Sequence, residues 1–498
     1  MRFTQWNAWA AGSAAAGVVV AAAVVAGTAA AGAAGTQAAA HGPVVKLIVA
    51  QKSITLESFR GRVYLDPGVY VASLRSALQF DVRRPSYTRP ITLTQVIYRP
   101  GGGTTTRSLP SRLLDGFNGL RDFLRLSVAD AAGQVVASTR PLFCLNFGPQ
   151  RAVPSSAGTN PYPPGCANDP FPKSLVMGLP RGWAADPAGF SISFPPPTVA
   201  LAPGTYKVTA AIAPQYVRLL HITAADAAAS VKLTVVKGRG CCSAAPLTAA
   251  GRARELAPLP RVRSLVSPPA TALPDLVPLP SWGISVRHDR RSGLDLLSFG
   301  ATVWVGGNSP LDVEGFRSNG SPVMKAYQYF WRNGHLVGRA RAGTMGFDSK
   351  KGHNHWHFEQ FARYTLLSKS KSVAVTSHKV GFCIAPSDPV NLLAPHAVWQ
   401  PPTVGLQGQC GTPTALWVAE QMPVGWGDTY TQSVAGQAFD ITHLPNGTYY
   451  IEITANPQHV LYESNTRNDA SLRKVILGGT PGHRTVKVPA WHSIDPEG

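Results

Sequence analysis

The sequence predicts a mainly β protein with two tandem β-sandwich-like domains. Gly and Pro account for 48 and 43 of the 498 residues, and only 14% of the residues are charged. Frequent Gly and Pro favour short strands joined by turns over long helices. The low charge excludes a coiled coil, and the 44% of apolar residues excludes a wholly disordered chain. An internal repeat in the sequence predicts that there are two such domains.

The second half of the chain repeats features of the first half in the same order. Each half has a Phe-Cys pair, a second Cys, a Gly-Trp pair, a Gly-Thr-Tyr turn and a strand of alternating pattern. In the first half these are Phe143-Cys144, Cys166, Gly182-Trp183, 203–206 and 207–212, and in the second Phe382-Cys383, Cys410, Gly425-Trp426, 445–449 and 450–454. Alternating strands between Gly, Pro and Asn turns are typical of β-sandwiches. Five matches in one order indicate a duplication.

This comparison divides the chain into five segments. They are a signal peptide at 1–40, a first β-domain at 42–236, a linker at 237–272, a second β-domain at 273–480 and a tail at 481–498. The linker has six basic residues against the single acid Glu255 and is rich in Ala and Pro. This composition predicts a solvated, semi-extended tether.

The N-terminal segment predicts export. Arg2 is followed by no charged residue until Lys46, and residues 8–34 are almost all Ala, Val and Gly. A charged start, an apolar run and small residues at 36–40 are typical of a secretory signal. The alternative is an uncleaved membrane anchor, since the run is long enough to span a bilayer. Either way, we expect a secreted or envelope-associated protein in an oxidising environment.

Charge and cysteine usage extend this prediction. The net charge of +20 suits anionic partners, such as a cell-wall polymer or a membrane surface, and we expect no specific nucleic-acid target. In an oxidising compartment Cys144–Cys166 and Cys383–Cys410 are predicted disulfides, because they occupy matching places in the two halves. The Cys241-Cys242 pair can form a vicinal bridge, a bridge between chains, or two free thiols.

Three histidines alternate in the second half, at His353, His355 and His357. Alternate side chains of a strand share one face, so the three imidazoles would project together. Nitrogen ligands suit Cu, Zn or Ni, with the highest affinity for Cu(II), and three ligands leave coordination positions open. We therefore predict a metal site, with a surface histidine cluster as the alternative. Trp356 and Phe358 would face the opposite side and fill the core.

The first half lacks these residues. Counting back from Phe143-Cys144, the matching stretch at 114–119 contains no His. Lys379 in the second half corresponds to Arg140 in the first, and Tyr430 corresponds to Pro187. The half with the three histidines is therefore also the half with this Lys and this Tyr, and the first half is a degenerate repeat without metal ligands.

The second half resembles the catalytic domain of the lysyl oxidase family. The resemblance covers about 200 residues and rests on motifs in the family's order, at 273–278, 353–357, 378–383, 427–430, 439–442 and 462–468. It implies that His353, His355 and His357 bind copper, and that Lys379 and Tyr430 join to form lysine tyrosylquinone. The animal enzymes have more cysteines and a collagen-directed pro-region without a counterpart here, so collagen and elastin are not implied as substrates.

The resemblance implies a copper- and quinone-dependent amine oxidase. Such an enzyme converts peptidyl lysine or another primary amine, with molecular oxygen, into an aldehyde, ammonia and hydrogen peroxide. Formation of the cofactor needs an unprotonated amine at Lys379, which burial beside a metal cation would favour. Removal of the substrate's α-proton needs a base, and Asp428, two residues from Tyr430, is a candidate, with a turn or supporting role as the alternative.

Two other functions fit parts of the sequence. Two β-domains, a basic tether and a high positive charge also suit a non-catalytic envelope protein that binds cell-wall polymer and is stabilised by its metal. A hydrolase that activates water on Zn is the third hypothesis. Dependence on Lys379 and Tyr430 separates the amine oxidase from both.

Overall fold

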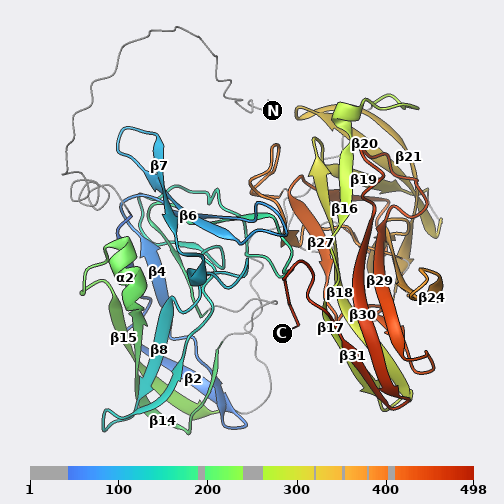
Figure 1. Ribbon diagram of the computed structural model, residues 1–498. Coiled ribbons are helices and arrows are strands. Elements are labelled where there is room, and N and C mark those ends of the chain that lie inside the picture. The colour runs from blue at the N-terminus through green and yellow to red at the C-terminus, as the bar shows by residue number, and fades with distance from the viewer. Residues whose placement is uncertain are drawn as a thin grey trace, which may run out of the picture. The chain divides into compact units, whose positions relative to one another are not determined.

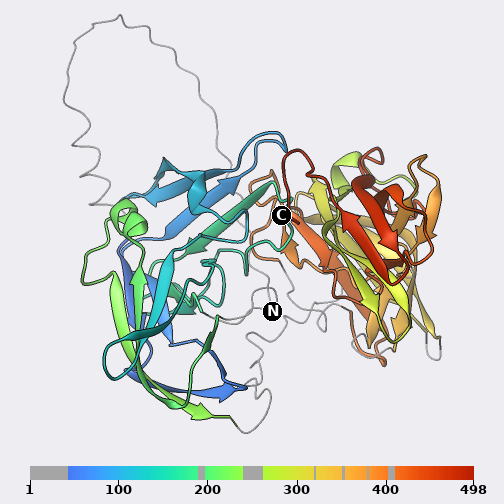
Figure 2. The ribbon, with the colours of Figure 1, turned by 60° about the horizontal axis from the view of Figure 1, so that its bottom comes forward.

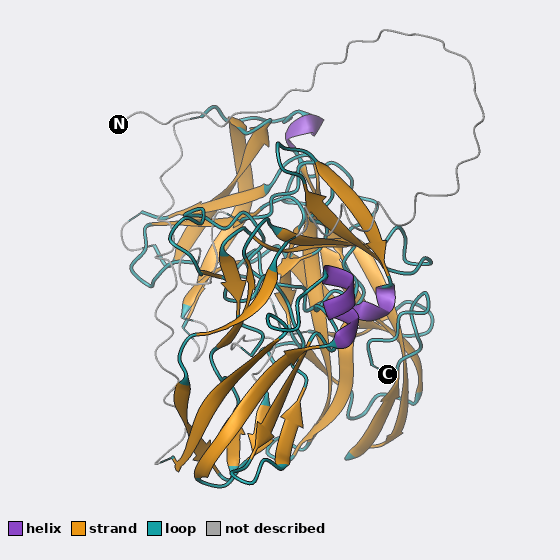
Figure 3. Ribbon diagram, turned by 90° about the vertical axis from the view of Figure 1, so that its left-hand side faces the viewer, coloured by secondary structure: helices purple, strands orange, loops and turns teal. Residues whose placement is uncertain are grey.

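The computed structural model describes residues 43–188, 197–238, 262–318, 321–349, 354–377, 379, 381–401 and 410–497. The predicted signal peptide or anchor, Cys241, Cys242 and most of the linker lie outside the described residues. Within them, helix is limited to α2 (Pro214–Leu220) and the short 3-10 turns η1 (Ser111–Leu113) and η2 (Ala270–Ala272). The remaining regular structure is strand, so the prediction of a mainly β fold is confirmed (Figure 3).

The first half forms three sheets. Their strand orders are β1-β4-β12-β10, β11-β5-β6-β7 and β13-β3-β2-β15-β14-β8-β9. The strands β14 and β15 run side by side, in green (Figures 1 and 2). In chain order the strands are β1 (Val45–Val49), β2 (Ser53–Phe59), β3 (Arg62–Tyr64), β4 (Val69–Ser73), β5 (Leu78–Arg83), β6 (Thr92–Tyr98), β7 (Thr104–Leu109), β8 (Leu124–Ala129), β9 (Val135–Thr139), β10 (Gln150–Arg151), β11 (Ser174–Leu179), β12 (Trp183–Ala185), β13 (Thr198–Ala200), β14 (Gly204–Ile212) and β15 (Ala228–Lys237).

The second half also forms three sheets. The first has the path β16-β18-β27-β25, with β17 and β28 also paired to β18, and the others are β22-β21-β20-β19-β26 and β24-β23-β29-β30-β31. In chain order the strands are β16 (Pro274–Pro278), β17 (Trp282–Asp289), β18 (Leu294–Gly307), β19 (Leu311–Phe316), β20 (Val323–Arg332), β21 (His335–Asp348), β22 (His355–Phe358), β23 (Ala362–Leu367), β24 (Val373–Thr376), β25 (Asp388–Pro389), β26 (Trp417–Met422), β27 (Trp426–Tyr430), β28 (Ala438–Asp440), β29 (Gly447–Ala455), β30 (Ala470–Thr480) and β31 (His483–Lys487).

Strand pairing follows the same order in both halves. The pair β4–β12 has the counterpart β18–β27, β5–β11 has β19–β26, and β14–β15 has β29–β30. Registers agree as well: Leu78 faces Leu179 in the first half, and Leu311 faces Met422 in the second. Duplication of the chain stays a prediction, but this shared register allows each residue of the site to be compared with its position in the first half.

The alternating segments form strands, as predicted. In β29, Tyr449, Ile451, Ile453 and Ala455 are buried and the residues between them are partly exposed. This period of two places one face of the strand in the core. The strand begins at Gly447, which follows a turn, and pairs with β23 and β30. The predicted alternation therefore extends three residues further towards the N-terminus.

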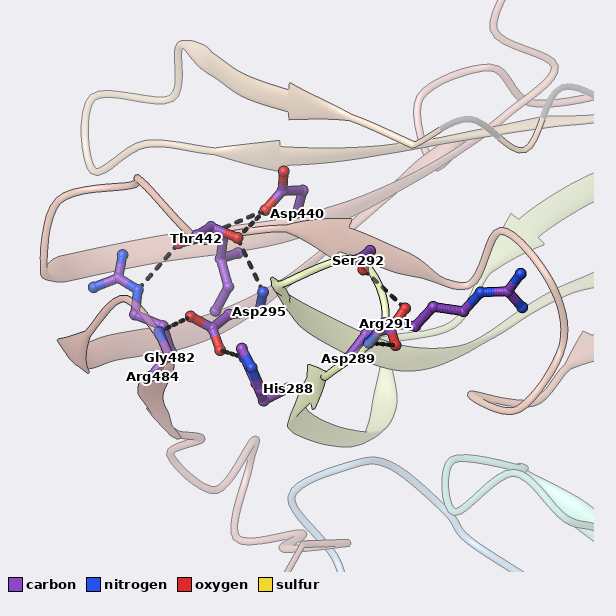
Figure 4. Close-up of polar contacts among 10 residues, drawn as sticks. His288, Asp289, Arg291, Ser292, Asp295, Asp440, Thr442, Gly482 and Arg484 are labelled. Carbon is purple, nitrogen blue, oxygen red and sulfur yellow. Dashed lines mark hydrogen bonds and ion pairs between the residues drawn. The ribbon is translucent and has the colours of Figure 1, made fainter.

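A buried carboxylate organises one end of the second half. Asp295 is the second residue of the long strand β18; its Oδ1 lies 2.9 Å from His288 Nδ1, and its Oδ2 accepts the N–H of Gly482 at 2.7 Å. Its own N–H donates to Thr442 Oγ1, and Arg484 Nε donates to the Ile441 carbonyl (Figure 4). These contacts anchor the turn before β31, so strand structure continues past residue 480, where the sequence suggested only a tail.

Both halves contribute to one compact unit, residues 41–498. The carboxylate of Asp388 on β25 is fully buried and accepts the N–H groups of Asn168 and Asp169, each at 2.9 Å. Asp388 also accepts the hydroxyl of Thr429 at 3.1 Å. Backbone of the first half is therefore bonded to the edge strand β25, which pairs with β27, the strand of Thr429.

The structure contains the disulfides Cys144–Cys166 and Cys383–Cys410, which confirms both predicted pairs. They hold corresponding places in the two halves. No helix in the described part of the chain combines the length and the apolar character needed to cross a membrane.

Candidate active site

Two of the three predicted metal ligands lie on β22. The Nε2 atoms of His355 and His357 are 2.9 Å apart, and their ring centroids are 4.7 Å apart. Trp356 and Phe358 are fully buried on the other face, as predicted from the alternation. His353 lies outside the described residues, and within these no cluster of three or more His, Cys, Asp or Glu side chains is present. The predicted triplet therefore stays a prediction.

The donor set at β22 fits a copper ion. Two imidazole nitrogens converge on one point, and His357 Nδ1 lies 3.9 Å from Asp348 Oδ2 at the end of β21. A carboxylate near Nδ1 favours the tautomer in which Nε2 carries the lone pair, as in metal-binding histidines with an outer carboxylate. Neutral imidazole nitrogen is a ligand that Cu(II) binds strongly.

Main-chain hydrogen bonds join β22 to the segment that follows Lys379. The N–H of Phe358 donates to the carbonyl of Phe382 at 2.8 Å, and the N–H of Phe382 donates back at 3.0 Å. Gly381 lies against His357, and a Cβ atom at this glycine would come within 2.8 Å of His357 Cβ. Only glycine permits this close approach, which places the histidines beside the lysine segment.

The structure brings Lys379 and Tyr430 together. The Lys379 Nζ lies 4.1 Å from the centroid of the Tyr430 ring and 4.8 Å from that of Phe382. The rings of Phe382 and Tyr430 meet edge to face, with centroids 5.3 Å apart. Lys379 is only 8% exposed, so its amine contacts the aromatic faces in a largely dry environment.

The Tyr430 side chain is fixed at its hydroxyl group. This oxygen accepts the N–H of Cys383 at 3.1 Å and donates to the carbonyl of the same residue at 3.2 Å. Gln437 donates to the Tyr430 carbonyl at 2.9 Å. Burial raises the pKa of Tyr430 well above its usual value, and the negative charge of Asp428 adds to the shift. The phenol is therefore held neutral and oriented at neutral pH.

Asp428 lies beside both partners. It is 4% exposed, and burial raises its pKa well above the usual range, while the positive charge of Lys379 opposes the shift. Its Oδ2 has no hydrogen-bond partner among the described residues. A buried carboxyl with a free acceptor atom next to the Lys379–Tyr430 pair can accept a proton from a substrate.

One ionisable residue of this site was missed in the sequence. Glu420 on β26 is fully buried, and its Oε2 accepts the N–H of Ile384 at 2.9 Å. The available signal was a lone acid within the otherwise uncharged stretch 416–424. An unpaired charge in a strand that reads as buried is unusual unless it has a specific role.

The sequence comparisons agree with the predicted resemblance. Residues 322–483 match the family model of lysyl oxidase. The chain is 28% identical to lysyl oxidase homolog 4 of Bos taurus over 140 residues, which cover 27% of this chain and 16% of the relative. Human lysyl oxidase homolog 4 is 29% identical over 133 residues, which cover 26% of this chain and 16% of the relative.

A zebrafish relative gives the same result: lysyl oxidase homolog 3B of Danio rerio is 26% identical over 141 residues, or 27% of this chain and 16% of the relative. The chain thus spans about one sixth of the length of these relatives. The second half therefore resembles the lysyl oxidase family, in the region that contains β22, Lys379 and Tyr430.

Proposed function

We propose that the protein is a secreted, copper- and quinone-dependent amine oxidase of the lysyl oxidase type. The observation that carries the proposal is the position of Lys379 Nζ, 4.1 Å from the centre of the Tyr430 ring. The similarity of residues 322–483 to lysyl oxidase supports it. Its substrate would be a primary amine, either a peptidyl lysine or a small amine, which reacts with oxygen and water to give an aldehyde, ammonia and hydrogen peroxide.

Copper would be held by His353, His355 and His357, and the organic cofactor would be lysine tyrosylquinone made from Lys379 and Tyr430. When present, this quinone supplies an electron acceptor that condenses with a primary amine. The hydrogen bonds between Tyr430 and Cys383 hold the phenol ring in one orientation. Because the Lys379 amine contacts the face of this ring, the two groups to be joined are already close before any reaction.

Asp428 would accept the α-proton of the substrate. A carboxylate whose pKa is raised by burial is a stronger base than an exposed aspartate, which suits proton removal near neutral pH. Its Oδ2, without a partner among the described residues, would receive the proton. The side chains of Phe382 and Tyr364, both almost fully buried, would exclude water around this oxygen.

The net charge of +20 supports an envelope location for this enzyme. A strongly cationic surface concentrates near anionic cell-wall polymer, which would keep the enzyme close to protein or small-amine substrates outside the cell. The first half, without histidine ligands, would serve as a scaffold for the second through contacts such as that of Asp388 with Asn168 and Asp169.

Peptide mapping of the copper-loaded protein tests the proposal most directly. We expect a crosslinked peptide that joins the segments around Lys379 and Tyr430, a positive redox stain for quinone, and peroxide release from a simple alkylamine. Wild-type protein that contains copper but gives neither the crosslinked peptide nor peroxide would refute the proposed function and favour the non-catalytic envelope protein.

A further inference from the structure

Three successive main-chain N–H groups hold three side chains of the candidate site. The N–H of Cys383 donates to the Tyr430 hydroxyl, that of Ile384 to Glu420, and that of Ala385 to Asp428. Tyr430 and Asp428 take part in the proposed reaction, whereas the proposed reaction does not use Glu420. The same short segment therefore fixes the position of a third ionisable group.

The environment of Glu420 favours its neutral form. Its side chain is fully buried, and the only hydrogen bond among the described residues is the one from Ile384 to Oε2, which leaves Oε1 without a partner. An ionised carboxylate needs several donors or a cation to offset the cost of leaving water. Burial raises the pKa of Glu420 well above its usual range, and the negative charge of Asp428 raises it further.

Of the two acids, Asp428 has the environment that better stabilises an ionised carboxylate. The positive charge of Lys379 and the N–H of Ala385 both stabilise its ionised form. Of the groups near Glu420, Asp428 and Tyr430 interact with it electrostatically, and each is neutral or negative. Tyr364, which also interacts electrostatically with Asp428, is a fully buried phenol with a raised pKa, so it adds no positive charge.

The first half shows that this strand position does not need an acid. The matching registers of β5–β11 and β19–β26 align Glu420 with Met177, and those of β4–β12 and β18–β27 align Asp428 with Ala185. Met177 and Ala185 are as fully buried as their counterparts. Both acids thus occur only in the half that has Lys379 and Tyr430, which indicates a role in the site rather than in folding.

We propose that Glu420 is a positioning residue of this site that carries a proton at neutral pH, so that Asp428 is the single carboxylate beside Lys379 and Tyr430. The protonation state of Glu420 stands independently of the reaction, and only its catalytic consequence rests on the proposed amine oxidation. In the metal-free protein, before Lys379 is joined to Tyr430, one carboxylate then balances one ammonium group in a dry site. A second negative charge would oppose the ionisation of Asp428, so that a smaller fraction of Asp428 would be ionised and available as a base at a given pH.

Infrared difference spectroscopy of the metal-free protein tests the protonation state. Glu420→Gln keeps the shape and an acceptor for the Ile384 N–H, but it cannot carry the proton. We expect the wild-type minus E420Q spectrum at neutral pH to contain one C=O band of a protonated carboxyl. In Asp428→Asn this Glu420 band should disappear at a lower pH than in the wild type, because the neighbouring negative charge is gone.

Glu314→Gln is the matched control. Glu314 is equally buried on the neighbouring strand β19, accepts the indole N–H of Trp417 at 2.8 Å, and has a pKa that burial and then Asp312 raise to about 8. E314Q should remove its own band and leave that of Glu420 and its pH midpoint unchanged. An E420Q spectrum with no lost band, or a Glu420 midpoint that does not move in D428N, would overturn the proposal.

Kinetics of the copper-loaded protein test the positioning role. Glu420→Met, which installs the residue of the first half, loses the hydrogen bond to Ile384, so we expect kcat to fall about fivefold or more with little change in KM. E420Q should recover most of this loss. Equal losses in E420M and E420Q would contradict positioning through Ile384. If the infrared results hold and no variant, including wild type, oxidises amines, then the proposed function fails and the protonated Glu420 stands.

Discussion

Lys379 Nζ lies 4.1 Å from the centroid of the Tyr430 ring, although the two residues come from separate segments of the second half. Main-chain bonds explain their proximity. The segment after Lys379 pairs with β22 through Phe382, and the next residue, Cys383, binds the Tyr430 hydroxyl through both its N–H and its carbonyl. The lysine, the tyrosine and the histidines are thus held by one short stretch of backbone.

Tyr430→Phe should abolish the quinone and leave the fold intact. The variant loses both hydrogen bonds to Cys383, so we expect a modest loss of stability of about 1–2 kcal/mol. Redox staining and intact mass measure the cofactor, and thermal unfolding measures the stability. Tyr449→Phe is the control, since its hydroxyl bonds the Pro445 carbonyl away from the site. A Y430F protein that still stains for quinone would contradict the assignment.

His357→Ala should weaken copper binding more than Asp348→Asn does. Loss of a carboxylate that orients a histidine ligand costs about 10–100-fold in metal affinity, and loss of the ligand itself costs more. Copper titration of the metal-free variants measures both effects. His396→Ala, on a surface turn with a positive φ of 63°, is the control and should bind as the wild type does. Equal affinity of H357A and wild type would exclude His357 as a ligand.

Gly381→Ala should disturb the histidine without changing any chemical group. The new methyl group would lie within 2.8 Å of His357 Cβ, so one of the two segments must shift. We expect a loss of stability of about 1–3 kcal/mol together with weaker copper binding. Gly158→Ala, where no atom lies within 4 Å of the added Cβ, provides the comparison. An unchanged copper affinity in G381A would show that the close contact does not position His357.

Stability should fall as the pH rises from about 4 to 8. Burial raises the pKa of Asp388 to about 8, with the Asp169 charge adding to the shift, and burial also raises the pKa of Glu314 to about 8. The folded protein therefore keeps protons that the unfolded chain releases near pH 4. Each carboxyl therefore makes its full contribution to stability at a pH below its pKa in the unfolded chain. This contribution is lost as the pH rises to its pKa in the folded protein.

Thermal unfolding between pH 5 and 9 measures this dependence. Each carboxyl contributes a slope of at most about 1.4 kcal/mol per pH unit. Asp388→Asn and Glu314→Gln should each make the profile shallower, and the double variant should be shallower still. A profile that keeps the wild-type slope in both single variants would show that neither carboxyl is protonated in the folded state.

The parts of the fold that local pattern encodes were predicted from the sequence. The alternation of apolar and polar residues predicted the strands around 207–212 and 450–454, because side chains two residues apart lie on the same face of a strand and that face packs in the core. The matching places of Cys383 and Cys410 in the repeat gave the second disulfide. The family motifs indicated that Lys379 and Tyr430 belong to one site, and in the structure the two side chains are in contact.

The remaining features depend on contacts between distant segments. Nothing near Asp388 in the sequence indicates that its carboxylate binds the backbone at Asn168 and Asp169, because backbone N–H groups leave no residue-type signal. Glu420 was overlooked since its significance depends on Ile384 and Asp428, which reach it only through the sheet. Strand β31 has short, mixed alternation, and its stability comes from pairing with β30 and from the Asp295–Gly482 contact.

The reciprocal bond pair between Phe358 and Phe382 has a counterpart in the first half, where Leu120 and Phe143 exchange the same two bonds, at 2.8 and 3.2 Å. Since such bonds involve no side-chain atoms, this backbone geometry does not depend on the reactive residues found in the second half. The first half is therefore a suitable scaffold for protein engineering. Histidines, a lysine and a tyrosine introduced at the equivalent positions would be supported by backbone hydrogen bonds that are already present.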